Sequence, residues 1–116
     1  MPRRPLFAFL VAFASAFAVW ALSPWLTGFA EPWDAPGVYY PVALFVAGTV
    51  SGAVAGKPFW PHYLGGILGQ FLYEILFLPV GPLAVVGLIF LAVWSLLLVS
   101  GAWLGAWIRG RYRGSA

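Results

Sequence analysis

The sequence predicts an all-α fold: a polytopic membrane protein whose single domain is a bundle of four transmembrane helices. Two observations lead to this prediction. Of the 116 residues, 63% are hydrophobic and only 8% are charged, whereas a soluble domain carries about 25% charged residues. The apolar residues also fall into four runs, each near the ~20 residues that a helix needs to cross a bilayer. This composition excludes an ordinary soluble enzyme and a disordered chain, which needs high charge and low hydrophobicity.

The four expected helices are separated by short breaks rich in proline and glycine. Proline lacks the backbone N–H that a helix needs and clashes with the preceding turn. The last break is so short that the helices on either side should be antiparallel neighbours. The breaks comprise Ser23-Pro24 with residues 31–37, then residues 56–62, then residues 79–82. The expected helices span residues 6–25, 38–56, 61–80 and 83–108.

The basic residues all fall on one side of this arrangement. Arg3 and Arg4 precede the first helix, Lys57 lies between the second and third, and three arginines (109, 111 and 113) follow the fourth. The acidic loop residues Glu31 and Asp34 lie on the other side. Because basic residues mark the cytoplasmic side, we expect an inner-membrane protein with both termini cytoplasmic, N-in and C-in.

A cleaved signal peptide is the alternative for the first helix. Arg3-Arg4 and the apolar run are followed by Ala14-Ser15-Ala16 or Ala16-Phe17-Ala18, which resemble cleavage sites. The apolar run continues through Leu22 and is longer than the core of a usual signal peptide, which favours a retained helix. Cleavage would leave three helices with the same orientation.

Small residues recur every fourth position on the last three expected helices. Such spacing puts glycines on one helix face and lets a second backbone approach closely, which drives helix association in lipid. The pattern does not say whether the partner helix belongs to this chain or to another. The predicted packing glycines are Gly48, Gly52 and Gly56, then Gly65 and Gly69, then Gly101 and Gly105.

The third expected helix also carries a polar stripe opposite its glycines, which predicts a central place in the bundle. At about 100° per residue, Tyr63, Gln70 and Glu74 share one face. Glu74 is the only acid inside an expected helix, with no Lys or Arg in any helix to neutralise it. We therefore expect it to be often protonated and bonded to Gln70, Thr49 or Ser95. Two interpretations stay open: a structural hydrogen-bond donor between helices, or a site for a proton or cationic substrate.

Aromatic side chains are expected at both membrane interfaces, where amphipathic rings favour the headgroup level. Lys57, Trp60 and His62 form a loop cluster that could bind a lipid headgroup. The outer belt comprises Trp25, Trp33, Tyr39 and Tyr40, and the inner belt Trp60, Tyr63, Trp103, Trp107 and Tyr112.

Little in the sequence supports catalysis, and we predict that the protein is not an enzyme and has no cofactor. The chain has no cysteine and one histidine, His62, so too few ligands exist for a metal site. Ser51 follows no nucleophile motif and has no evident base, a single aspartate excludes an acid pair, and no phosphate loop is present. Six basic residues are too few for nucleic-acid binding.

The sequence thus predicts a small transport or channel subunit, homo-oligomeric, in which Glu74, Gln70 and Tyr63 line a polar path. Because four helices enclose little space, a route would form more easily between protomers than within one. The alternative is an accessory or assembly subunit that docks through its glycine faces on a larger membrane protein. No residue pattern names a substrate, an ion or a partner other than the lipid bilayer.

Overall fold

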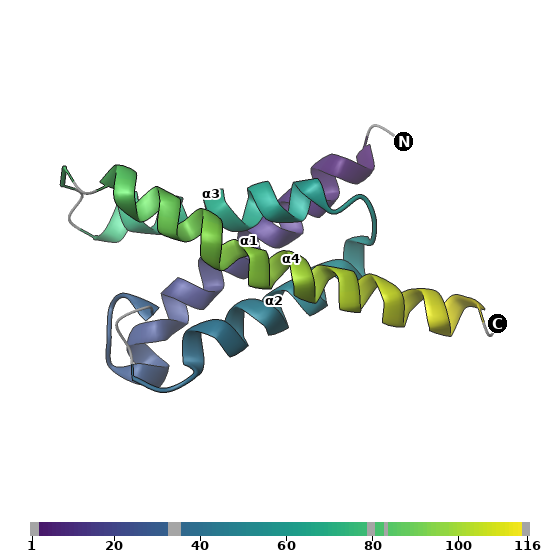
Figure 1. The fold of residues 1–116 in the computed structure, drawn as a ribbon, viewed down its shortest axis with the longest axis horizontal. Coiled ribbons are helices and arrows are strands. Elements are labelled where there is room, and N and C mark those ends of the chain that lie inside the picture. The colour runs from purple at the N-terminus through teal and green to yellow at the C-terminus, as the bar shows by residue number, and fades with distance from the viewer. Residues whose placement is uncertain (1–2, 33–35, 79–80, 83, 115–116) are drawn as a thin grey trace.

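The computed structural model describes residues 3–32, 36–78, 81–82 and 84–114, with side chains described between Pro5 and Arg111. This part of the chain is all-helical, with four helices and without strands, which confirms the all-α part of the predicted fold class (Figure 1). Two helices are long and apolar enough to span a membrane, over Pro5–Thr27 and Ala84–Arg111. The helices are α1 (Arg3–Thr27), α2 (Tyr39–Ala55), α3 (Trp60–Phe77) and α4 (Ala84–Gly114).

The predicted break at Ser23-Pro24 is wrong, because α1 continues through Pro24 and ends at Thr27, two residues past its predicted end. A proline in a last turn removes only one helix hydrogen bond, and nearby hydroxyls bind backbone groups there. The Thr27 hydroxyl donates to the Ser23 carbonyl at 2.8 Å, and the Ser23 hydroxyl donates to the Phe29 carbonyl at 2.7 Å. The chain then leaves the helix at Gly28, whose φ of 81° suits glycine.

The other predicted boundaries agree with the structure to different degrees. Helix α2 begins and ends within one residue of its predicted range 38–56, whereas α3 ends at Phe77 rather than 80. Helix α4 extends six residues past its predicted end at 108. Four residues named in the predictions lie outside the described part of the chain: Trp33, Asp34, Val80 and Leu83.

The tightest helix pairs are not neighbours in sequence. Helix α1 packs most extensively on α3, and α2 on α4, while the neighbours α1·α2 and α3·α4 make smaller contacts. Both tight pairs are parallel, since Gly65 meets Phe9 and Gly69 meets Phe13, one turn further along each helix. Helices α3 and α4 are antiparallel neighbours, as the short third break predicts (Figure 1). Helix α3 contacts all three other helices, and so does α2.

The two ends of the molecule carry different segments (Figure 1). Both chain termini and the α2–α3 connection lie at one end, here named the termini end, beyond which α4 projects. The α1–α2 and α3–α4 connections lie at the opposite end. The basic side chains Lys57, Arg109 and Arg111 therefore lie at the termini end, and Glu31 lies at the opposite end.

The core is narrow and the outer surface is apolar. Ala8, Ala12 and Ala16 form a fully buried small-residue face on α1, beneath which larger side chains such as Trp20 and Leu98 fill the centre. Large apolar side chains are at the same time exposed on every helix. Since soluble monomers rarely expose large contiguous apolar patches, this surface suits an apolar surrounding.

Candidate functional site

Gln70 lies at the centre of the bundle and joins all four helices. Its amide oxygen accepts hydrogen bonds from the Trp20 indole of α1 at 2.7 Å and from the Tyr40 hydroxyl of α2 at 2.5 Å. Its amide nitrogen donates to the Ser95 hydroxyl of α4 at 3.0 Å and to the Gly66 carbonyl of its own helix at 3.0 Å. A glutamine side chain has two acceptor positions and two donor hydrogens, so this hub uses all four.

The hub is sealed from its surroundings. Gln70, Trp20 and Ser95 are fully buried and Tyr40 is nearly so. The Tyr40 ring also packs on the ring of Trp94, with centroids 4.7 Å apart. Tyr40 therefore does not belong to the outer aromatic belt in which the sequence places it. The structure places Gln70 in a closed network, which gives it a structural role within one chain.

Tyr63, the second residue of the predicted polar stripe, is also engaged within the chain. Its half-buried hydroxyl donates a hydrogen bond to the Ala92 carbonyl of α4 at 2.7 Å. Tyr63 and Gln70 thus both bind α4 from one face of α3. Tyr63 and Gln70 therefore do share one face of α3, as the sequence predicts. Their hydrogen bonds hold α3 against the other helices.

Glu74, the third member, lies in the last turn of α3 and is half-buried. The expected hydrogen bonds to its side chain are wrong, because the three named partners are bound elsewhere. Gln70 is saturated by its hub, Ser95 binds Gln70, and the Thr49 hydroxyl donates to the carbonyl one turn before it in α2 at 2.9 Å. Glu74 itself lies near the end of α3, at the opposite end of the molecule from the termini.

The surroundings of Glu74 are acidic and aromatic. Glu31 in the α1–α2 segment and Tyr40 lie within Coulombic range of its carboxylate. No Lys or Arg of the described residues lies at this end, since Lys57, Arg109 and Arg111 lie at the termini end. Two carboxylates near each other attract positive charge. Of the three residues of the stripe, Tyr63 and Gln70 are hydrogen-bonded to α4, and the Glu74 side chain forms no hydrogen bond with the described residues.

His62 and Ser51 form a second buried polar pair, at the start of α3 and the last turns of α2. Both are fully buried, and the Ser51 hydroxyl lies 2.6 Å from His62 Nδ1. His62 Nε2 lies 2.8 Å from the Gly56 carbonyl, which can only accept, so Nε2 carries the proton and Ser51 donates to Nδ1. The prediction that Ser51 has no evident base is wrong, because His62 lies beside it. The pair lacks access for a substrate and fastens α2 to α3.

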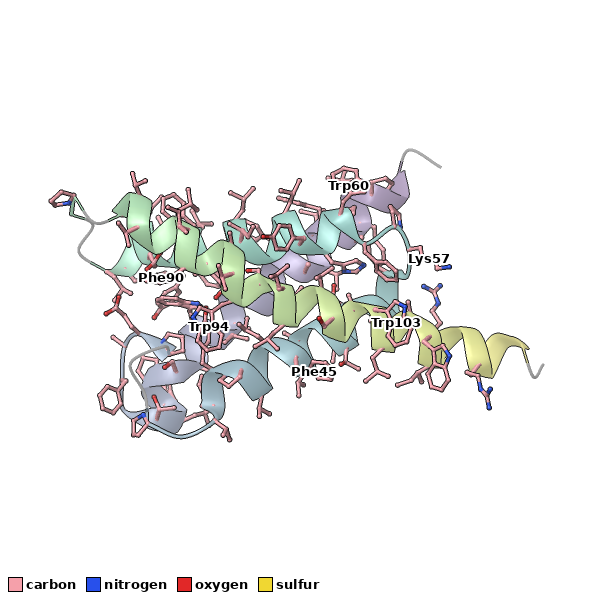
Figure 2. All side chains as sticks on the ribbon, viewed as in Figure 1. Phe45, Lys57, Trp60, Phe90, Trp94 and Trp103 are labelled. Carbon is pink, nitrogen blue, oxygen red and sulfur yellow. The ribbon has the colours of Figure 1, made fainter. Side chains whose placement is uncertain are left out.

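The burial of His62 also removes it from the predicted headgroup cluster. Its two other members, Lys57 and Trp60, remain exposed near the termini end (Figure 2). The described residues contain no group of three potential metal ligands among His, Cys, Asp and Glu. Asp34, one of the three acidic residues of the sequence, lies outside that part of the chain.

The glycines of α2 and α4 pack against each other's backbone. A Cβ atom at Gly48 would collide with the carbonyl of Leu98, and one at Gly101 would collide with the carbonyl of Phe45. The contact is reciprocal and repeats one turn further along, so the two helices approach closely over about two turns. The second glycine on each helix meets the partner backbone in the same way: Gly52 at Ala102, and Gly105 at Thr49.

The remaining predicted glycines are used inside the chain as well. Gly65 and Gly69 of α3 lie against the α1 backbone at Phe9 and Phe13. Gly56 has a different role, because it ends α2 with a φ of 68°. The faces named for docking on a larger complex are therefore occupied by this chain's own helices.

Sequence reasoning missed the hub because its partners look ordinary in an apolar run. Trp20 falls in the first expected helix, and Tyr40 in the expected outer belt. The one polar atom on each side chain is the only feature of the sequence that could have indicated the hub. Comparisons with known protein families, curated proteins and solved structures found no match for this chain.

Proposed function

We propose that this chain is an integral membrane protein that crosses the inner membrane four times and serves as a homo-oligomeric transport or channel subunit. In this arrangement both termini are cytoplasmic and the opposite end faces outward. The single observation that carries the transport role is Glu74, a helix acid with a second acid nearby and no basic residue at its end of the described chain.

The membrane location rests on dimensions and on surface chemistry. The molecule is 49 Å along its longest axis, against a hydrocarbon thickness of ~30 Å. Helices α2 and α3, with 17 and 18 residues, are about 25 and 27 Å long at ~1.5 Å per residue. Slightly short helices are accommodated by local thinning of the bilayer. The buried side-chain N and O atoms of the described residues all have hydrogen-bond partners, as a low-dielectric surrounding requires.

The proposed topology follows from which charges share an end. Lys57, Arg109 and Arg111 lie with the termini, and Glu31 and Glu74 lie at the other end. Basic residues near helix ends are retained on the cytoplasmic side. The even number of helices that places both termini together agrees with this assignment (Figure 1).

Single-cysteine labelling should confirm this topology, because the native chain has no cysteine to interfere. Ala30 and Gly110 are exposed at the two ends. In intact cells with a permeable outer envelope, a membrane-impermeant maleimide should label Ala30→Cys and leave Gly110→Cys unlabelled until lysis. Labelling of Gly110→Cys before lysis would reverse the orientation, and equal labelling of both positions would contradict a membrane barrier between them.

The route for a cation is proposed to lie between protomers. Within one chain the centre is closed by the saturated Gln70 hub, and the tight α1·α3 and α2·α4 pairs leave only backbone-to-backbone contact at their glycines. Glu74 is half-buried at the edge of this closed bundle. A carboxylate there could bind a proton or a small cation where a second copy completes its surroundings.

Replacing Glu74 with glutamine should abolish most of the flux while leaving the fold intact. We expect at least about a tenfold loss of proton or monovalent-cation flux in liposomes, since a charged hydrogen bond contributes about 1.5–3 kcal/mol. Glutamine keeps the side-chain size but cannot carry the charge. The measurement is ion flux from proteoliposomes, together with the detergent-corrected mass of the purified protein.

The matched control is Ser100→Ala, which removes an exposed hydroxyl bonded only within its own helix. This variant should show wild-type flux and the same oligomeric mass. Unchanged flux in Glu74→Gln would remove the transport role from that residue. A monomer without any flux, which co-purifies with another membrane protein, would favour the accessory role, with docking through the outer apolar faces.

A further inference from the structure

We propose that Lys57 and Arg109 together bind the phosphate of an anionic phospholipid at the termini end of the bundle. This inference rests on the proposed membrane location but not on transport. It differs from the headgroup cluster expected from sequence, since the buried His62 is replaced by an arginine from a distant part of the chain.

Arg109 is held over the end of α2 by the backbone. Its Nη1 donates a hydrogen bond to the Val54 carbonyl at 3.2 Å, one of the last carbonyls of α2 without a helix partner. The chain turns beneath it at Gly56, where an added Cβ would lie 3.0 Å from the same Nη1. The glycine therefore leaves room for the guanidinium. One of its five N–H groups is used in this contact, and the rest of the planar fork can still donate to a phosphate.

Lys57 supplies a second cation directly after that glycine. It is exposed and makes no ion pair within the described chain, whose two acids, Glu31 and Glu74, belong to the opposite end. Two cations at one helix end favour an anion, and phosphate accepts hydrogen bonds from both an arginine fork and a lysine ammonium group.

Exposed tryptophans fix the depth of this site in the bilayer. Trp60 at the start of α3 and Trp103 on α4 are each 59% exposed, and both lie toward the same end as Lys57 (Figure 2). Indole rings settle at the headgroup level of a bilayer. The two cations therefore lie at the depth of lipid phosphates, and the occupant is a lipid rather than a free anion.

Native mass spectrometry of the full-length protein tests this site directly. Protein released from micelles with equal phosphatidylglycerol and phosphatidylcholine should retain the anionic lipid with about tenfold preference, the effect of a charge-assisted phosphate contact. Arg109→Ala and Lys57→Ala should each lower that preference about fivefold or more. Arg109→Lys should recover only part of it, because the fork is lost.

Arg111→Ala is the matched control, since its guanidinium lies over the Trp107 ring, 5.4 Å from the centroid, further along α4. It should change lipid retention by less than about twofold, as a distant charge does. Equal losses in all three alanine variants would overturn the proposal in favour of diffuse attraction. Arg109-dependent stabilisation by inorganic phosphate in lipid-free detergent would overturn the lipid assignment.

The lipid site and the transport role can fail separately. Glu74→Gln should retain phosphatidylglycerol at the wild-type level even if its flux is lost, because Glu74 lies at the opposite end. A lipid site without flux leaves this inference standing, and flux without lipid preference overturns it alone.

Discussion

Replacing Gln70 with leucine is expected to destabilise the bundle by about 2–4 kcal/mol, because three interhelical hydrogen bonds are lost together. Leucine is similar in size, so the change removes polarity more than volume. The Trp20 indole and the hydroxyls of Tyr40 and Ser95 would then be left buried, each without its Gln70 partner. Unfolding in mixed micelles, followed by the fluorescence of the seven tryptophans, measures the change.

Two further variants show whether the loss comes from the hub. Tyr40→Phe removes one of its bonds and should cost about 1 kcal/mol alone. Combined with Gln70→Leu it should cost less than it does alone, since its bond to Gln70 is already gone. Ser100→Ala, outside the hub, should stay within about 0.5 kcal/mol of the wild type. A Gln70→Leu variant of wild-type stability would show that the hub does not hold the helices together.

Replacing Gly101 with alanine should separate α2 from α4 and cost about 1–3 kcal/mol, the usual effect of overpacking. The added Cβ would collide with the Phe45 carbonyl, and backbone cannot move aside as the end of a flexible side chain can. Gly101→Val should cost more, because its branched side chain is larger. The same micelle unfolding experiment measures both variants.

Gly110→Ala is the internal control for this series. Gly110 lies on the same helix, and an added Cβ would meet no atom within 4 Å. Alanine is the better helix former by up to about 1 kcal/mol, so this variant should be neutral or slightly more stable. Equal stabilities for Gly101→Ala and Gly110→Ala would contradict the close α2·α4 contact.

The candidate site was predictable in its residues and not in their partners. The 100° helix period alone puts Tyr63, Gln70 and Glu74 on one face of α3, and the scarcity of charge singles out Glu74. Which side chains meet that face depends on how the helices pack in space. The chemistry of Tyr40 suits the membrane interface and the bundle core equally well, because its ring is apolar and its hydroxyl is polar.

The glycine pattern shows the same division. The spacing of glycines by four residues predicts a close helix contact but does not identify the partner helix. The structure pairs each glycine face with a helix two elements away, α1 with α3 and α2 with α4. Short connections bring helices that are neighbours in sequence together. The helices that approach each other most closely are nevertheless those whose small residues fit against the partner's backbone.

By itself, the sequence determined the helical class, the number of helices and the separation of charge between the ends, because composition and period are local properties. Nine charged side chains among 116 residues are the feature of the sequence that predicts an apolar surrounding. Only the tertiary structure decided that Gln70 is closed inside a network, that His62 is buried against Ser51, and that Arg109 reaches the end of α2. These contacts join residues up to 55 positions apart, and such pairings arise only when the backbones have packed.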